Sequence, residues 1–323
     1  MTTWEKVLSA LRKHKSFLVS THVNPDPDAL GSELSMASYL RALGKRVHIV
    51  NEEPAPQRLA FLPQARQVKG YAKNRDVACC DAAIILDCGE LDRIGKVQKL
   101  ISPETFIINI DHHVTNDFFG DINLVEPKAS STAEVLYTLF KESGRALTKD
   151  LAFNLYVGLM TDTGSFRFEN TTARTHAICA ELMKFGFSVT DIYRKVYASI
   201  PYKDLKEFTK LISRFDVLYG GRVVCVELSR AILAKFSKQF DLRDTIFQFL
   251  RAMHGVDVFV IFTEAGAKKT RINLRSSSKF DVAKLASDFS GGGHKRASGC
   301  TIDKGMKEAR QVFLGQIGKL LRA

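Results

Sequence analysis

Short apolar runs alternate with longer amphipathic stretches along the first half of the chain. Four runs are largely apolar, as in strands buried on both faces of a parallel sheet: 17–20, 47–50, 82–86 and 105–110. Three longer stretches, one between these runs and two after them, have apolar residues near helical spacing: 28–43, 131–143 and 149–161. This alternation predicts an α/β fold, with a doubly wound, mostly parallel sheet in a domain over residues 1–188.

In the second half, a helical region comes first and the alternation of strands and helices then returns. Residues 172–214 favour helices, and we assign 189–214 to a helical connector. Three later runs favour strands: 222–228, 256–263 and 270–276. Three further stretches favour helices: 229–237, 243–253 and 305–321. Residues 215–323 are therefore predicted to form a smaller α/β domain.

Composition narrows the class of protein. With 323 residues, 45% hydrophobic and 25% charged, the chain resembles an ordinary globular protein. No apolar run approaches the ~20 residues that cross a bilayer, and the first residues favour an amphipathic helix over a signal peptide. We expect a cytoplasmic protein with no membrane partner, and leave a homodimer open.

The cysteines and the net charge are less specific indications of function. No CxxC pair occurs, so we expect buried or incidental thiols in a reducing compartment at 79, 80, 88, 179, 225 and 300. The net charge of +12 favours a polyanionic partner, although a solvated basic face would give the same charge.

Four segments end an apolar run with Asp or His. They carry His22, Asp26 and Asp28; Asp87; Asp111, His112 and His113; and Asp162. In a parallel sheet the carboxyl ends of the strands meet at one crevice, where ligands bind. Carboxylates gathered there repel one another unless cations lie between them. Asp oxygens with imidazole nitrogens and no cysteine suit Mn²⁺ or Mg²⁺ better than structural zinc, which predicts a two-metal phosphoesterase site.

Each motif alone has an ordinary explanation. Asp26 and Asp28 also fit a Pro-Asp turn with a helix cap, and an Asp28 cap would place both carboxylates at the positive end of the helix. Asp87 alone fits a turn. Thr132 fits a helix cap as well as a crevice wall, and Phe166 with Phe168 favours core packing over base stacking.

Two motifs in the second half suit phosphate binding. Alternation over 270–276 places Ile272 and Leu274 inward, and Arg271, Asn273 and Arg275 outward, to grip phosphate and a base edge or simply to face solvent. The run Gly291-Gly-Gly-His294 brings backbone N–H groups and an imidazole to an anion, or forms a flexible loop.

Together these motifs resemble the DHH phosphoesterase superfamily, named for Asp111-His112-His113. Within this superfamily, the chain resembles the bacterial nanoRNase and pAp phosphatase branch. That branch also resembles the cyclic-dinucleotide phosphodiesterases. The resemblance rests on three further segments: 22–32, 162–168 and 291–299. The last of these marks the DHH-associated domain. The resemblance therefore implies that residues 1–188 form the DHH catalytic domain and residues 215–323 the DHH-associated substrate-binding domain.

The resemblance implies roles for individual residues. His22 and Asp26 would hold one Mn²⁺, and Asp28, His112 and Asp162 the other, with Asp87 bridging them; Mg²⁺ or Co²⁺ are the substitutes considered. Asp111 and His113 would be catalytic groups beside the ions or facing the phosphate. Substrate would be held by Arg271, Arg275, Gly292, Gly293 and His294. Arg296 stands where relatives often carry an uncharged residue. It would either bind a second phosphate or face solvent.

The implied activity is a Mn²⁺-dependent phosphodiesterase or phosphatase. It would cleave short oligoribonucleotides (nanoRNA), linear dinucleotides and pAp to mononucleotides, by attack of a metal-bound hydroxide. A cyclic-dinucleotide phosphodiesterase is the main alternative. A family II pyrophosphatase fits the basic charge and the glycine motif less well, and a RecJ-like exonuclease would need a further domain. A catalytically silent nucleotide sensor would not need every metal ligand.

Overall fold

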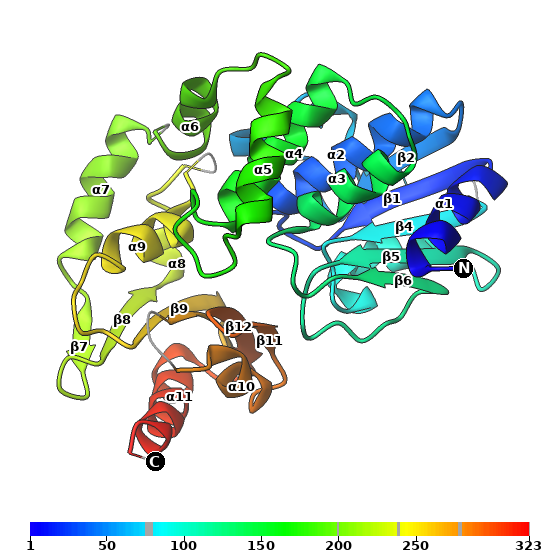
Figure 1. Cartoon of the computed structure of the whole chain (residues 1–323). Coiled ribbons are helices and arrows are strands. Elements are labelled where there is room, and N and C mark those ends of the chain that lie inside the picture. The colour runs from blue at the N-terminus through cyan, green and yellow to red at the C-terminus, as the bar shows by residue number, and fades with distance from the viewer. Residues whose placement is uncertain (75–79, 199, 238–239, 277–279, 323) are drawn as a thin grey trace. The chain divides into compact units, whose positions relative to one another are not determined.

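A computed structural model describes residues 1–74, 80–198, 200–237, 240–276 and 280–322 (Figure 1). The chain forms two compact units, Met1–Ala198 and Ser199–Ala323. Their boundary falls inside the predicted connector, so that helix α6 (Val189–Tyr197) belongs to the first unit and α7 (Tyr202–Ile212) to the second.

The first unit contains a six-stranded sheet in which every pairing is parallel. The strand order is β3-β2-β1-β4-β5-β6. The strands are β1 (Ser16–Thr21), β2 (Arg46–Asn51), β3 (Lys69–Gly70), β4 (Ala82–Leu86), β5 (Phe106–Asp111) and β6 (Ile122–Val125). The order reverses between β1 and β4, which makes their carboxyl ends the topological switch point where α/β sheets bind ligands.

Helices form a layer over one face of this sheet (Figure 1). They are α2 (Pro27–Ala42), α3 (Thr132–Glu142), α4 (Lys149–Asp162) and α5 (Ala173–Met183), with α1 (Thr3–Lys13) at the amino terminus. Phe17, Val19 and Ile84 pack into the core beneath the helices. Leu18 and Ile85 point to the opposite face, against the 3₁₀ segment η4 (Leu91–Leu100). The central strands are thus buried on both faces, and the predicted fold class is confirmed.

The second unit is built on a mixed sheet in the order β11-β12-β10-β9-β8-β7. Its strands are β7 (Asp216–Leu218), β8 (Val223–Leu228), β9 (Val258–Gly266), β10 (Lys269–Ser276), β11 (Gly292–His294) and β12 (Ala297–Ile302). Its other helices are α8 (Arg230–Leu233), α9 (Leu242–Leu250), α10 (Val282–Ser287) and α11 (Met306–Leu320). Only β8 and β9 pair in parallel among these strands.

Some elements differ from prediction. The helix expected over 229–237 is confined to Arg230–Leu233, and β6, α10 and β12 were not expected. The glycine run is not a flexible loop, because Gly292–His294 pairs with β12 as an edge strand.

Five cysteines are buried and form no disulfide: Cys80, Cys88, Cys179, Cys225 and Cys300. Cys79 lies outside the described residues. Among those residues, no helix has both the length and the apolar character needed to span a bilayer.

Candidate active site

Side chains from both halves of the parallel sheet meet at its switch point. His22 follows β1, Asp87 follows β4, and Asp111 ends β5 with His112 directly after it. The amino end of α2 adds Asp26 and Asp28, while Asp162 ends α4. The structure therefore brings together the first-half residues singled out from sequence.

Asp87 lies at the centre of this group. Its Oδ2 is 3.6 Å from His22 Nε2, and its Oδ1 is 3.5 Å from His112 Nε2. His112 Nε2 is also 3.5 Å from Asp162 Oδ2. Asp87 has a left-handed backbone with φ 53°, a conformation that Asp and Asn adopt more readily than most residues. The turn after β4 thus aims a carboxylate between two imidazoles.

Both imidazoles are oriented from behind by backbone carbonyls. His22 Nδ1 is 3.0 Å from Val23 O, and His112 Nδ1 is 3.3 Å from Ala129 O. A proton on each Nδ1 leaves Nε2 as the nitrogen that faces the carboxylates. Metal-binding histidines have this arrangement, because a bond to one ring nitrogen fixes the other as the ligand.

The two aspartates at α2 have different structural roles, and the expected cap is corrected. Asp26, not Asp28, is the N-cap of α2, and its Oδ1 accepts from Ala29 N at 2.9 Å. Asp28 instead accepts from Thr132 N and Ala133 N, at 2.8 and 3.1 Å, and so caps the neighbouring helix α3. Asp28 therefore fixes α2 against the positive end of α3.

Thr132 also reaches the centre directly. Its Oγ1 donates to Asp87 Oδ1 at 2.8 Å. The N-cap residue of α3 is Ser131, which accepts from Glu134 N, while Asp28 accepts from the first two N–H groups of the same helix. Of the two interpretations drawn from sequence, the structure supports the crevice wall for Thr132. This hydroxyl holds one Asp87 oxygen in place.

Crowding of carboxylates changes their acidity. Burial, with added repulsion from Asp87 and Asp162, raises the pKa of Asp28 well above its usual range. Burial likewise raises the pKa of Asp162 to about 7, with repulsion from Asp26 and Asp87 adding to the effect. Burial opposes the charged form of Asp87 too, but His112 and His22 outweigh it and hold the pKa of that carboxyl well below its usual value.

The donor set fits divalent cations. Within the first unit, three groups have ligand atoms within 4.8 Å of one another: His22 with Asp26 and Asp87, Asp28 with Asp87 and His112, and Asp87 with Asp111 and His113. Separations of 3.5–3.6 Å exceed a hydrogen bond but suit two ligands of one ion at about 2.1 Å from each. The nearby Cys88 thiol contacts Glu90 O instead, so the donors are oxygen and nitrogen.

Asp111 and His113 form a separate pair at the edge of the centre. His113 Nδ1 donates to Asp111 Oδ1 at 2.7 Å, and Asp111 is fully buried. His113 Nδ1 is also 3.8 Å from Asp87 Oδ1. The two adjacent histidines therefore differ, because His112 turns Nε2 to the carboxylates whereas His113 turns Nδ1 to them.

In the second unit, the expected alternation along β10 is present. Ile272 and Leu274 are fully buried, while Arg271, Asn273 and Arg275 lie on the other face. Strand register sets Arg275 opposite Ala297, and Ala297 opposite His294 on β11. Residues paired across a sheet share a face, so Arg275 and His294 flank the small side chain of Ala297.

The glycines of β11 have a packing role. Gly293 has φ 134°, and a Cβ there would lie 2.6 Å from Ala297 O. Two residues along, on the same face of the sheet as Arg275, Gly292 lies opposite Gly299, which lies opposite Asn273. Small residues therefore separate the polar side chains of β10 from His294.

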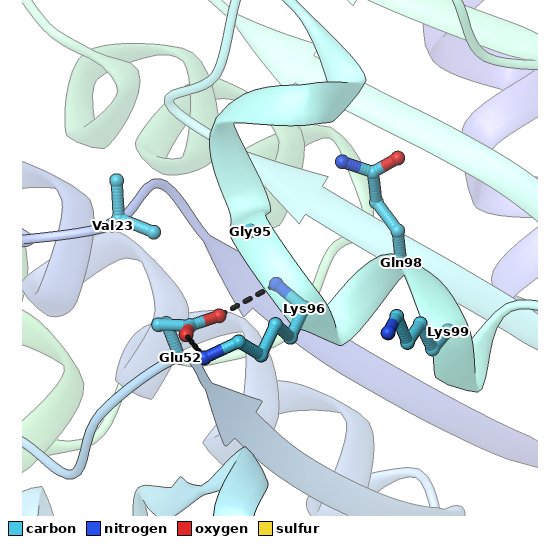
Figure 2. Close-up of a pocket in the computed structure, with 6 residues that line it drawn as sticks. All are labelled: Val23, Glu52, Gly95, Lys96, Gln98 and Lys99. Atoms are coloured by element: carbon cyan, nitrogen blue, oxygen red, sulfur yellow. Dashed lines mark hydrogen bonds and ion pairs between the residues drawn. The ribbon is translucent and has the colours of Figure 1, made fainter.

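A cavity of about 480 Å³ opens beside the end of β1 (Figure 2). Glu52 lines it and contacts Lys96 twice: Oε1 is 2.9 Å from Lys96 Nζ, and Oε2 accepts from Lys96 N at 2.6 Å. Val23, the residue after His22, forms another wall. None of the residues predicted to bind metal or substrate lines this cavity.

The aromatic pair of the Asp162 segment favours packing. Phe166 packs against the core of the first unit and approaches Tyr156 and His176. The ring of Phe168 occupies the space that a Cβ at Gly164 would need. The segment is a turn rather than a strand.

Two residues near the centre were not identified from sequence. Gly158 in α4 lies so close to Asp28 that an added Cβ would be 2.4 Å from its Oδ1. Asn116 donates to Asp111 Oδ2 at 2.7 Å. A glycine inside an otherwise apolar helix was the available sign for the first, since glycine is unfavourable there without a close neighbour.

Comparisons with known proteins agree with this geometry. The model for the "DHH family, N-terminal domain" matches residues 16–159, and that for the "DHHA1 domain" matches residues 232–323. The chain is 30% identical over 305 residues to the "Bifunctional oligoribonuclease and PAP phosphatase NrnA" of Thermus thermophilus, covering 93% of this chain and 89% of that protein. It is 27% identical to the Bacillus subtilis protein of the same name, covering 92% of each.

Solved structures show the same fold. An exopolyphosphatase-related protein from Bacteroides fragilis superposes with a TM-score of 0.88 at 27% identity, over 99% of this chain and 98% of that one. RecJ from Thermus thermophilus, solved with Mn²⁺, superposes with a TM-score of 0.55 at 14% identity, over 98% of this chain and 53% of RecJ. The chain belongs to the DHH family, with a DHH domain followed by a DHHA1 domain, and is a hydrolase of phosphoester bonds.

Proposed function

We propose that this chain hydrolyses short oligoribonucleotides, linear dinucleotides and pAp to mononucleotides. The relatives named as oligoribonuclease and PAP phosphatase span nearly the whole chain, so both domains are shared with them. The net charge of +12 is in keeping with small polyanionic substrates.

The observation that carries the proposal is the placement of Asp87 between two histidines. His22 and His112 approach its two oxygens with Nε2, while each Nδ1 faces a backbone carbonyl. Two imidazoles oriented toward opposite oxygens of one carboxylate are what a bridging ligand between two cations requires. A sensor that only bound nucleotides would have no use for this arrangement.

We assign the donors accordingly. His22 and Asp26 would hold one ion, Asp28, His112 and Asp162 would hold the other, and Asp87 would be shared by both. Mn²⁺ is the proposed metal, with Mg²⁺ and Co²⁺ as substitutes. When bound, such ions neutralise charge on the phosphoryl group and make water a stronger nucleophile.

The remaining residues bind substrate and move protons. His113, whose Nδ1 donates to Asp111 Oδ1, is proposed to exchange a proton with the reacting phosphoester or its leaving group. In the DHHA1 domain, Arg271 and Arg275 are proposed to bind a phosphate of the substrate, together with His294 and the backbone of Gly292 and Gly293.

The experiment is a turnover screen of chelator-treated protein. Substrates are pAp, linear dinucleotides, RNA of five and 24 nucleotides, and cyclic dinucleotides, each with Mn²⁺, Mg²⁺, Co²⁺ or EDTA. Asp87→Asn is the matched control, because it keeps the shape and the left-handed backbone but removes the charge. We expect Mn²⁺-dependent release of mononucleotides from pAp and the short linear substrates, and loss of turnover in Asp87→Asn.

Several outcomes would contradict the proposal. Full turnover by Asp87→Asn with metal still bound would remove the bridging role. Preference for cyclic dinucleotides, or faster degradation of the 24-mer than of dimers, would point to another substrate class. Nucleotide binding without turnover under every metal would indicate a sensor.

A further inference from the structure

Asp111 is a buried carboxylate whose two oxygens both have partners. Its Oδ1 accepts from His113 Nδ1 at 2.7 Å and from His112 N at 2.8 Å. Its Oδ2 accepts from Asn116 Nδ2 at 2.7 Å. One oxygen of the carboxylate therefore orients the His113 ring, and the other oxygen is held by Asn116 from the loop that follows.

The orientation of the Asn116 amide is determined by its surroundings. Asn109 donates its Nδ2 to Ile85 O and Cys88 O, at 3.2 and 3.1 Å, so its Oδ1 must face Asn116. Asn116 Oδ1 accepts from Phe118 N at 2.8 Å, which leaves Nδ2 for Asp111 and Asn109. Each group in this chain has one orientation that satisfies its neighbours.

We propose that Asn116 is a positioning residue, whose amide fixes the Asp111 carboxylate and through it the orientation of His113. This inference rests on the proposed function, because it takes His113 as the group that exchanges a proton with substrate. Asn116 is nearly buried, at 8% exposure, and Asn109 is fully buried, so water does not compete strongly for these bonds.

The bond to Asp111 determines which nitrogen of His113 is available to exchange a proton with substrate. A carboxylate accepts from a protonated Nδ1, so Nε2 is the nitrogen available for proton exchange. If Oδ2 lost its donor, Asp111 could rotate and the His113 ring would lose its fixed direction. Loss of orientation lowers the rate of a proton transfer without removing a metal ligand.

Two variants separate this role from loop folding. Asn116→Ala removes the amide altogether. Asn116→Ser keeps a hydroxyl that can accept from Phe118 N, as serine does in turns, but is too short to reach Asp111. The matched control is Asn123→Ala, because the Asn123 side chain bonds Phe118 O and Gly120 O in the same loop but does not contact Asp111 through a hydrogen bond.

The first measurement is kinetic, on a linear dinucleotide with Mn²⁺. We expect both Asn116 variants to lower kcat roughly tenfold to a hundredfold, as for a hydrogen bond to a charged group, with KM and the Mn²⁺ requirement little changed. Asn123→Ala should leave kcat near that of the natural protein. In a His113→Ala background, Asn116→Ser should cause no further loss, because the residue acts through His113.

The second measurement does not need turnover. In ¹⁵N-histidine-labelled full-length protein, the His113 resonances, assigned by their loss in His113→Ala, should show a protonated Nδ1 that changes in Asn116→Ser but not in Asn123→Ala. Unchanged His113 resonances, or an equal loss of kcat with and without His113, would overturn the positioning role. Absence of turnover in the natural protein would instead refute the proposed function, leaving the spectra to decide the role of Asn116.

Discussion

The guanidinium of Arg275 lies over the ring of Phe247, with Cζ 4.8 Å from the ring centroid. Phe247 is almost fully buried in α9, and Arg275 Nη1 also donates to Leu274 O at 3.0 Å. The arginine is thus held in place by contacts within its own domain. A side chain fixed in advance loses less conformational freedom when it binds a phosphate.

Arg275→Ala is expected to raise KM on dinucleotides while leaving Mn²⁺ binding intact. A charge-assisted contact of roughly 1.5–3 kcal/mol corresponds to about a tenfold to hundredfold loss in kcat/KM. The loss should be far smaller on a chromogenic phosphodiester that lacks a second nucleotide. Equal losses on both substrates would mean that Arg275 does not bind the distal group.

Phe247→Leu tests the contact between the Arg275 guanidinium and the Phe247 ring by changing the ring instead of the arginine. The substitution keeps apolar volume but removes the aromatic face, worth about 0.5–2 kcal/mol to a nearby cation. We expect a smaller rise in KM than for Arg275→Ala, and no further rise when both changes are combined. Independent effects in the double variant would show that the ring does not support Arg275.

Asp28→Asn and His112→Ala should be non-additive in Mn²⁺-dependent turnover. Both residues are assigned to one ion, so removing either should impair that position nearly as much as removing both. A double-mutant cycle of kcat/KM measures this coupling directly. Losses that multiply would place the two residues at separate ions.

Gly158→Ala should weaken metal binding although Gly158 is not a ligand. The added methyl group would lie 2.4 Å from Asp28 Oδ1 and 2.9 Å from Ala133 Cβ, so the carboxylate must move. Titration with Mn²⁺ should show a raised dissociation constant. Gly315→Ala in α11 is the control, because its Cβ meets nothing within 4 Å and should preserve or raise stability. Unaltered Mn²⁺ affinity in Gly158→Ala would exclude Asp28 as a ligand.

Glu33→Gln should change the pH dependence of stability. Burial raises the pKa of Glu33 to about 8, opposed by the bond from Asn51 Nδ2 at 2.9 Å. The folded pKa lies above the unfolded value near 4.5, so the folded state holds the extra proton and the free energy of unfolding falls as pH rises from about 4.5 to 8. The slope is at most about 1.4 kcal/mol per pH unit.

Denaturant unfolding at pH 5, 6, 7 and 8, in EDTA, measures this effect as the difference between the natural protein and Glu33→Gln. The difference should shift steadily in favour of the glutamine variant with rising pH. Parallel stability curves would show that Glu33 titrates normally in the folded protein.

The sequence was most informative where local pattern and tertiary position coincide. Apolar runs ending in Asp or His located the strand ends at His22, Asp87 and Asp111, because the carboxyl ends of parallel strands share one edge of the sheet. The same alternation located Arg271 and Arg275 on one face of β10. Both patterns depend on residues adjacent in the chain.

Contacts between distant segments could not be derived in this way. Asp28 caps α3, more than one hundred residues away in the sequence, rather than the helix that contains it. The glycine run became a strand because β12 lies beside it, and glycine has little strand preference of its own. Asn116 appears as an ordinary loop asparagine until Asp111 is placed next to it.

The left-handed backbone at Asp87 also limits what can replace it. Asp and Asn are the residues that combine a short oxygen-bearing side chain with tolerance of positive φ, and of these only Asp carries the charge. Glutamate could supply a carboxylate but would strain the turn. A homologue that has lost catalysis yet kept its fold is therefore expected to carry asparagine here, so this single position can separate hydrolases from silent binders in a sequence survey.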